Sequence, residues 1–268
     1  MIWLVLLIVI IPLILLMLVW LIKTWLSPNN ETIIDMNHLN KIRQCAILSM
    51  MAYKNVNSSL IKILEDPSGY QNVKGYMFRQ NNEIYIVFQG TANLSDLKTD
   101  IDTKLVEINQ GVLVHEGFYK YFISIYPLIL EQLDKYQNWN KIIITGHSLG
   151  GGLALLAQYH LMGKYDTQCI TFGSPRVGND KFAESFKNET NSVRVYNFED
   201  PVPMVPINNQ YQHPTSPALC IDFDMNYDIK SRDYIKAFRW LILYICSYWP
   251  QKFYPHYIEN YISVLNRI

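Results

Sequence analysis

The sequence predicts an α/β fold in which helices cover both faces of a mostly parallel sheet. Short runs rich in β-branched and aromatic residues alternate with longer segments whose apolar residues recur at helical spacing. One of these runs, residues 142–145, passes through a glycine-rich turn into an apolar helical pattern at 153–159. The chain has 268 residues and a formal net charge of zero. That length accommodates one sizeable domain of this class.

The expected elements follow from these patterns in chain order. Strands are predicted at 73–78, 84–88, 142–145, 169–172, 192–198 and 218–223. Helices are predicted at 37–53, from about 115 to 133, at 153–159 and after residue 256. Asn81 and Asn82 between the first two strands indicate a hairpin turn. In a parallel sheet, functional residues are expected just beyond the carboxyl ends of the strands.

The turn after the third strand contains the pattern Gly-x-Ser-x-Gly, residues 146–150, between a buried strand and a helix. This context is the one in which such a serine is a nucleophile. The turn is expected to hold Ser148 in a strained conformation, with Gly146 and Gly150 lacking the Cβ atoms that would collide with each other. Ser148 then lies at a helix N-terminus, where free N–H groups can stabilise a negative charge.

A serine nucleophile needs a base and an acid that orients the base. His213 and His256 are the two candidate bases, and His256 is preferred because it follows the last predicted strand. Asp200 is the preferred acid, since it ends a strand beside a proline, and Glu199 is its neighbouring competitor. The oxyanion hole is expected to use the backbone N–H of Leu149 and a donor at Thr91, after an earlier strand.

The other four histidines are not expected to act as the base. His147 adjoins the nucleophile and should point elsewhere, so it is interpreted as structural, as is His160 inside the following helix. His115 is expected to pack near the site, and His38 lies far upstream.

Taken together, these motifs resemble the class 3 (fungal-type) lipases, which have the α/β-hydrolase fold. The matching segments are 87–91, Asp96 with Asp100, 115–118, 146–151, 172–178, 197–203 and the late His256. The resemblance implies a triad of Ser148, Asp200 and His256, an oxyanion hole of Thr91 and Leu149, and hydrolysis of glycerolipid or other carboxylic esters. It implies no metal ion and no other cofactor.

The resemblance also assigns residues 92–103 to a lid, with Leu94, Asp96 and Leu97 as lid candidates. The family often has Trp where Leu97 stands and Arg where Gln89 stands. The segment carries several charges and few large apolar side chains. A lid of this polarity is expected to bind a lipid surface weakly, which argues against strong interfacial activation and against a preference for long triglycerides.

The first residues predict a membrane anchor. Met1–Ile22 is uninterruptedly apolar and would form a helix roughly 33 Å long, enough to span a bilayer. A cleaved signal peptide is the alternative, but no positively charged start or small-residue cleavage site is present. The predicted organisation is an anchor at 1–24, a polar hinge at 25–36 and a catalytic domain at 37–268. Lys23 favours a cytoplasmic catalytic domain, whereas four Asn-x-Ser/Thr sequons keep a lumenal one open.

Composition limits the remaining possibilities. A neutral chain carries no electrostatic footprint for nucleic acid, and its four cysteines lack metal-type spacing. The expected partners are therefore a lipid or other ester substrate and a membrane, with the oligomeric state open. Residues 237–249 are expected to form a half-buried helix or, alternatively, an interfacial one. Acyl transfer by the same triad, or an inactive membrane-tethered interaction protein, are the alternative functions.

Overall fold

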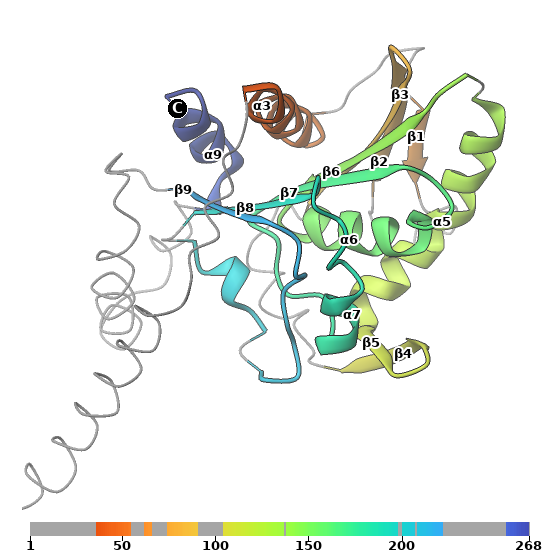
Figure 1. Ribbon diagram of the computed structural model, residues 1–268, viewed down its shortest axis with the longest axis vertical. Helices are drawn as coiled ribbons and strands as arrows, with labels where there is room; N and C mark the ends of the chain where they lie inside the picture. Colours follow the sequence, from red (N-terminus) through yellow and green to blue (C-terminus); the bar gives the residue numbers. More distant parts are fainter. Residues whose placement is uncertain are drawn as a thin grey trace, which may run out of the picture. The chain divides into compact units, whose positions relative to one another are not determined.

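A seven-stranded sheet forms the centre of the described part of the chain, in the order β1-β2-β3-β6-β7-β8-β9 (Figure 1). The computed structural model describes residues 36–54, 62–65, 74–90, 104–136, 138–197, 200–206, 208–221 and 256–267. The strands are β1 (Lys62–Glu65), β2 (Lys74–Gln80), β3 (Glu83–Phe88), β6 (Lys141–His147), β7 (Thr167–Phe172), β8 (Val193–Asn197) and β9 (Ala218–Ile221). Strands β3, β6, β7, β8 and β9 pair in parallel, so the predicted mostly parallel sheet is confirmed.

The antiparallel part of the sheet is the hairpin of β2 and β3, with β1 added at its edge. The predicted turn at Asn81 and Asn82 is present, and Asn81 has a φ of 55°. Asparagine tolerates this left-handed conformation better than most residues, which explains its use here. The sequence pattern did not predict β1, a four-residue edge strand too short to show a period of its own.

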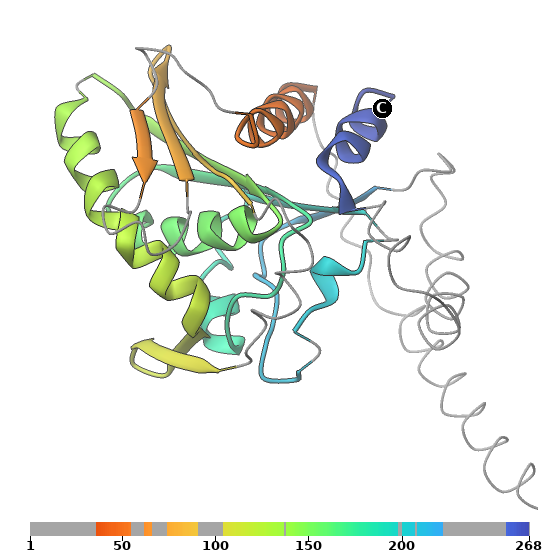
Figure 2. The same cartoon turned by 180° about the vertical axis from the view of Figure 1, so that it is seen from behind.

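Helices cover both faces of the sheet, as expected. Figures 1 and 2 show α3 (Met36–Met51) and α9 (Ile258–Leu265) on one face. On the other face lie α5 (Glu116–Lys135) and α6 (Leu149–Leu161). All four correspond to predicted helices. Helix α6 begins directly after β6, so the N-terminus of α6 lies at the carboxyl end of that strand.

Two smaller elements escaped the sequence analysis. Strands β4 (Leu105–Asn109) and β5 (Val112–His115) form a separate two-stranded antiparallel sheet. The short helix α7 (Asp180–Glu184) begins at Asn179, whose side chain accepts the Phe182 N–H. Within the hairpin only Val114 and His115 are buried, so its hydrophobic alternation is weak. A pattern that depends on one buried face is then hard to detect.

The core lies between the sheet and the pair α5 and α6. In β6, residues 142–147 are all buried, which matches a central parallel strand covered on both faces. Phe122 and Ile129 of α5 and Leu153 and Leu156 of α6 are fully buried in the same cluster as Ile144. This packing fixes the direction in which α6 leaves the end of β6.

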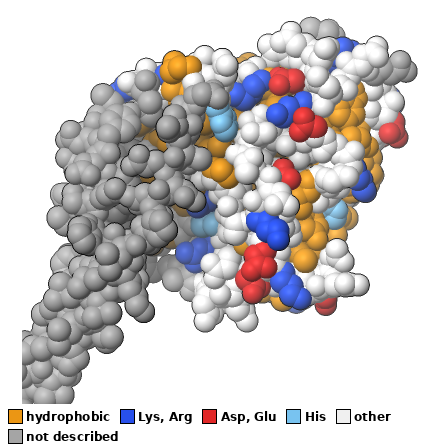
Figure 3. Space-filling model, viewed as in Figure 1, with side chains coloured by type: hydrophobic (Ala, Val, Ile, Leu, Met, Phe, Trp, Pro, Cys, Tyr) orange, Lys and Arg blue, Asp and Glu red, His pale blue; other side chains and the backbone are white. Residues whose placement is uncertain are grey.

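Several predicted features lie outside the described residues. They are the anchor at Met1–Ile22, nearly all of the hinge at 25–36, the lid at 92–103 and the segment 237–249. No helix in the described ranges combines the length and the apolar character that a membrane span requires. On the described part of the face in Figure 3, acidic and basic side chains are interspersed rather than gathered by sign. This distribution agrees with the neutral composition.

We expect Phe122→Ala to lower the free energy of unfolding by about 3–5 kcal/mol, because Phe122 is fully buried and its loss leaves a cavity. The matched control is Ile123→Ala on the next position of α5, where the side chain is 39% exposed. That change should cost less than about 1 kcal/mol. Urea denaturation of both variants measures the difference, and equal losses would contradict the packing described for α5.

Candidate active site

The carboxyl ends of four neighbouring strands meet at one edge of the sheet. Phe88 of β3 pairs with Gly146 of β6, and His147 pairs with Phe172 of β7. Phe172 pairs in turn with Val195 of β8. The residues that follow these strand ends therefore converge, as expected for an open parallel sheet.

Ser148 occupies the turn between β6 and α6 in a strained conformation. Its φ is 59° and its ψ is −129°, a combination that residues with a Cβ rarely adopt. The Ser148 N–H donates to the Phe172 carbonyl at 3.0 Å, which ties the turn to the end of β7. The residue is also the N-cap of α6, and its carbonyl oxygen accepts the N–H groups of Gly151 and Gly152. The predicted tight turn is thus present.

Glycines permit this turn, although one contact differs from the prediction. A Cβ on Gly146 would lie 2.3 Å from the Gly150 carbonyl oxygen, as expected. A Cβ on Gly150 would instead lie 2.4 Å from the Phe88 carbonyl oxygen. A side chain at Gly146 would therefore collide with Gly150, but a side chain at Gly150 would collide first with Phe88 rather than with Gly146. Gly150 allows α6 to approach strand β3, which the local sequence pattern alone could not reveal.

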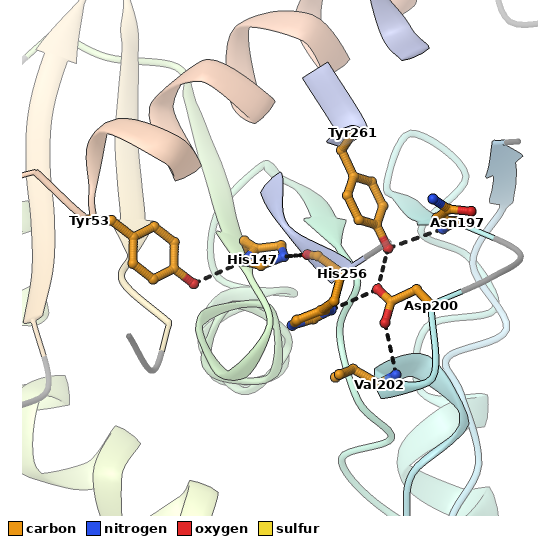
Figure 4. A network of polar contacts seen from close by, with 7 residues as sticks. All are labelled: Tyr53, His147, Asn197, Asp200, Val202, His256 and Tyr261. Atoms are coloured by element: carbon orange, nitrogen blue, oxygen red, sulfur yellow. Dashed lines mark hydrogen bonds and ion pairs between the residues drawn. The ribbon is translucent and has the colours of Figure 1, made fainter. Parts of the chain in front are cut away.

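Asp200 and His256 form a buried hydrogen-bonded pair (Figure 4). His256 Nδ1 lies 2.7 Å from Asp200 Oδ2, and both side chains are fully buried. The other carboxylate oxygen, Oδ1, accepts the Val202 N–H at 2.9 Å. A carboxylate in this position holds the imidazole with Nδ1 protonated, so that Nε2 can accept a proton.

Tyr261 is a third member of this group that sequence reasoning missed. Its hydroxyl donates to Asp200 Oδ2 at 2.6 Å and accepts the Asn197 N–H at 3.0 Å. Burial and the neighbouring carboxylate raise the pKa of Tyr261 well above its usual value, so the phenol remains a donor. Tyr261 lies in α9, five positions after His256. No motif marks it, and only the helical turn brings it back to Asp200.

His256 lies beside the chain segments that flank Ser148. Its ring centroid is 4.5 Å from that of His147, the residue before Ser148. A Cβ on Gly173, the residue after Phe172, would lie 3.1 Å from His256 Cε1 and 2.7 Å from Asp200 Oδ2. Since Ser148 is bonded to Phe172, the imidazole and the serine lie at the same end of the sheet.

The remaining atoms of the serine and the imidazole are complementary. Ser148 Oγ and His256 Nε2 are both buried, and neither has a hydrogen-bond partner among the described residues. One is a potential nucleophile and the other a potential base whose orientation a carboxylate fixes. Hydrogen bonds between such groups often tighten only when a substrate binds. The arrangement is suited to nucleophilic attack on a carbonyl carbon.

His213, the alternative base, has a different environment. Its Nε2 donates to the Pro203 carbonyl at 2.6 Å. Burial, with Arg194 and Arg176 nearby, lowers the pKa of His213 to about 3. The structure therefore brings His256 to Asp200, whereas His213 is bonded to the loop beyond it.

The other described histidines have packing or capping contacts. His115 Nδ1 accepts the Phe118 N–H at the start of α5, and the two rings stack at 4.1 Å. His160 packs against Phe122 and Tyr126, and burial lowers its pKa. His38 Nε2 lies 3.5 Å from Gln168 Nε2. His147 hydrogen-bonds Tyr53 and the main chain of His256.

Part of the predicted site lies outside the described residues, namely Thr91, Glu199 and the lid candidates Leu94, Asp96 and Leu97. Leu149 is described and is the first residue of α6, directly after Ser148. Within the described ranges, no three or more His, Cys, Asp and Glu side chains form a group that could hold a metal ion. Cys45 and Cys169 are buried free thiols, and burial raises the pKa of both.

Comparisons with known proteins find sequence similarity to lipases. Residues 85–210 match the Lipase (class 3) family. The chain is 35% identical over 152 residues to a lipase of Rhizopus niveus, covering 50% of this chain and 38% of the relative. It is 33% identical over 158 residues to a secreted mono- and diacylglycerol lipase of Fusarium solani, covering 55% and 47%. The chain thus spans less than half the length of these relatives.

The crystal structure of the Lip2 lipase from Yarrowia lipolytica has a similar fold. It superposes with a TM-score of 0.61 at 26% identity, covering 74% of this chain and 83% of that one. Strands β6, β7 and β8 and the strained serine turn lie within the residues that match the family. Over residues 85–210, just under half of its length, the chain is similar in sequence to the class 3 lipases.

Proposed function

We propose that the protein is a serine hydrolase that cleaves ester bonds of acylglycerols through an acyl-enzyme. The observation that carries the proposal is the buried Asp200–His256 hydrogen bond beside a strained Ser148 at a helix N-terminus. The class 3 lipase match and the relatives named as lipases support the same chemistry. In this mechanism every group is a side chain or backbone N–H of the chain itself.

The reaction follows from the roles of these groups. His256 Nε2 takes the proton of Ser148 Oγ as the oxygen bonds to the ester carbonyl carbon, and Asp200 stabilises the resulting imidazolium. The Leu149 N–H and Thr91 would stabilise the oxyanion. The carbon–oxygen bond then breaks, and His256 gives its proton to the departing alcohol. His256 then takes a proton from water as the water oxygen bonds to the acyl carbon. The bond from that carbon to Ser148 Oγ breaks, Ser148 regains its proton from His256, and the fatty acid leaves.

Replacing Ser148 with Ala should abolish ester hydrolysis, since the proposed acyl-enzyme forms on Ser148 Oγ. The expected loss in kcat is at least about 10⁴-fold for p-nitrophenyl butyrate. Asp200→Asn should keep the fold and lose about 10³–10⁴-fold, because an amide can stabilise the wrong imidazole tautomer. A fluorophosphonate probe should label the wild type and spare Ser148→Ala. Equal labelling of both proteins would disprove the assignment of the nucleophile.

For the substrate, we propose acylglycerols with an accessible ester rather than long triglycerides in bulk oil. The relative from Fusarium solani is named a mono- and diacylglycerol lipase, which supports partial glycerides. The segment 92–103 also carries four charged residues, Asp96, Lys98, Asp100 and Asp102, which disfavour insertion into an oil surface.

Substrate preference can be tested with monoacyl-, diacyl- and triacylglycerols of one acyl chain in the same detergent. We expect kcat/KM to be higher for the partial glycerides, and the rate to rise smoothly through the solubility limit. A sharp rise in rate when the substrate forms an interface would contradict the proposed weakness of the lid at lipid surfaces.

We further propose that Met1–Ile22 anchors the protein in a membrane, with the catalytic domain on the cytoplasmic side. The uninterrupted apolar run and Lys23 at its end support this arrangement. An anchor would keep the site close to lipid without a strongly apolar lid.

The anchor is tested by expressing the full chain and a chain that begins at residue 25, followed by carbonate extraction of membranes. The full chain should remain in the pellet, and the shortened chain should be released, because removal of about 20 apolar residues eliminates the span. Release of both chains would refute the anchor. A full chain shortened by protease would instead indicate a cleaved signal peptide.

A further inference from the structure

A second polar chain reaches His256 from the opposite direction to Asp200 (Figure 4). Tyr53 Oη lies 2.9 Å from His147 Nδ1, and His147 Nε2 lies 2.6 Å from the main-chain oxygen of His256. His147 is 4% exposed and His256 is fully buried. These contacts join the residues just after α3, the end of β6 and the residue that begins the turn before α9.

The chemistry of the groups allows only one direction for these hydrogen bonds. A main-chain carbonyl oxygen can only accept, so His147 Nε2 carries the proton and donates. Burial and the neighbouring His256 lower the pKa of His147 well below its usual value, so the ring is neutral and its Nδ1 is an acceptor. Tyr53 must then donate, and burial raises the pKa of its phenol, which keeps the proton in place.

Tyr53 also lies against the end of strand β3. A Cβ on Gly90 would lie 2.2 Å from Tyr53 Oη and 2.5 Å from the His147 carbonyl oxygen. Gly90 immediately precedes Thr91 in the sequence. The Tyr53–His147 pair therefore contacts both the chain just after β3 and the residue His256 before α9, and any side chain at Gly90 would displace it.

We propose that Tyr53 and His147 are positioning residues that hold the main chain of His256 at a fixed place relative to Ser148. This inference rests on the proposed function. Asp200 fixes the orientation of the His256 ring, but a ring bond alone leaves the Cα free to move. The bond from His147 fixes the backbone from which that ring projects. Because His147 directly precedes Ser148, the end of β6 holds both the nucleophile and the main chain of the base in position.

Loss of either of the two hydrogen bonds that hold His256, to Asp200 and to His147, should affect catalysis in a different way. Loss of the bond to Asp200 changes the tautomer and the charge balance of the imidazole. Loss of the bond to His147 changes only distance and angle between Nε2 and Ser148 Oγ. A displacement of about 1 Å between reacting groups can reduce a rate by about 100-fold without altering substrate affinity. We call the contacts from Tyr53 through His147 to the His256 main chain the brace. Loss of the brace is therefore expected to lower kcat at an unchanged KM.

The chain offers a matched control between the same two elements. Ser49 Oγ of α3 lies 3.1 Å from Thr145 Oγ1 of β6, and both residues are fully buried. Thr145 Oγ1 donates to the Ile170 carbonyl, so Ser49 is the donor in this pair. Ser49→Ala removes a buried hydrogen bond between α3 and β6. Tyr53→Phe removes one between the chain just after α3 and the last residue of β6, but Ser49 is not hydrogen-bonded to His147 or His256.

The experiment measures kcat and KM for p-nitrophenyl butyrate and, separately, the rate of labelling by a fluorophosphonate probe. The melting temperature of each variant reports its stability. His147→Leu should lower kcat and the labelling rate about 10- to 100-fold, with KM within about twofold of the wild type. Tyr53→Phe should cause a smaller loss of the same kind. Ser49→Ala should lower the melting temperature and leave kcat and the labelling rate unchanged.

A variant that restores the hydrogen bond separates the loss of positioning from the effect of a changed side-chain volume at His147. His147→Gln keeps an amide N–H that can donate to the His256 carbonyl, so it should recover at least about tenfold of the kcat lost in His147→Leu. If His147→Leu does not fold, the comparison of Tyr53→Phe with Ser49→Ala carries the test. Wild-type kcat in Tyr53→Phe or in a folded His147→Leu overturns the inference, as does an equal kcat loss in Ser49→Ala.

Failure of the proposed function gives a different result. In that case the wild type itself shows no turnover that Ser148→Ala abolishes, and the brace variants lose nothing because nothing is catalysed. A wild type that hydrolyses the ester through Ser148, together with undiminished brace variants, overturns the positioning role alone.

Discussion

The rest of the site depends on how the buried carboxylate of Asp200 is compensated. Removing a charge from water is costly unless hydrogen bonds replace those lost. Here the His256 imidazole and the Tyr261 hydroxyl, from one segment, and the Val202 N–H, from the loop that carries Asp200, supply three donors. Each donor is therefore held in place by the carboxylate it stabilises. The position of His256 is a consequence of satisfying Asp200, and this couples α9 to the loop after β8.

Strain at Ser148 is sustained in a similar way by its surroundings. A backbone at φ 59° and ψ −129° would relax unless packing opposed it. The bond from the Ser148 N–H to Phe172 opposes relaxation on one side, and the close approach of Gly150 to Phe88 opposes it on the other. Both contacts are made with the strands that flank β6, so the turn cannot relax without disturbing the sheet. A fixed nucleophile is useful only if the base is equally fixed, which gives the bond between His147 and the His256 carbonyl its importance.

The sequence was informative where a local pattern carries the physics. The parallel strands, the hairpin turn at Asn81 and the serine turn each depend on nearby residues, and the structure contains all of them. Contacts between distant segments were not readable in this way. Tyr261 and Tyr53 belong to helix-side segments whose patterns indicate only packing, and their hydroxyl partners lie 61 and 94 positions away. The hairpin of β4 and β5 was missed because it buries too little to impose a period.

His147 and His256 show why residue type alone did not distinguish structural from reactive groups. Their rings lie 4.5 Å apart and both are buried, yet their hydrogen bonds differ in kind. Both nitrogens of His147 have partners, a phenol and a main-chain carbonyl, and neither partner is a carboxylate. His256 has a carboxylate on Nδ1 and leaves Nε2 without a partner in the described part of the chain. His256 therefore has a nitrogen available to accept the serine proton, whereas both nitrogens of His147 are already hydrogen-bonded. In the proposed role, His147 holds His256 where that proton is transferred.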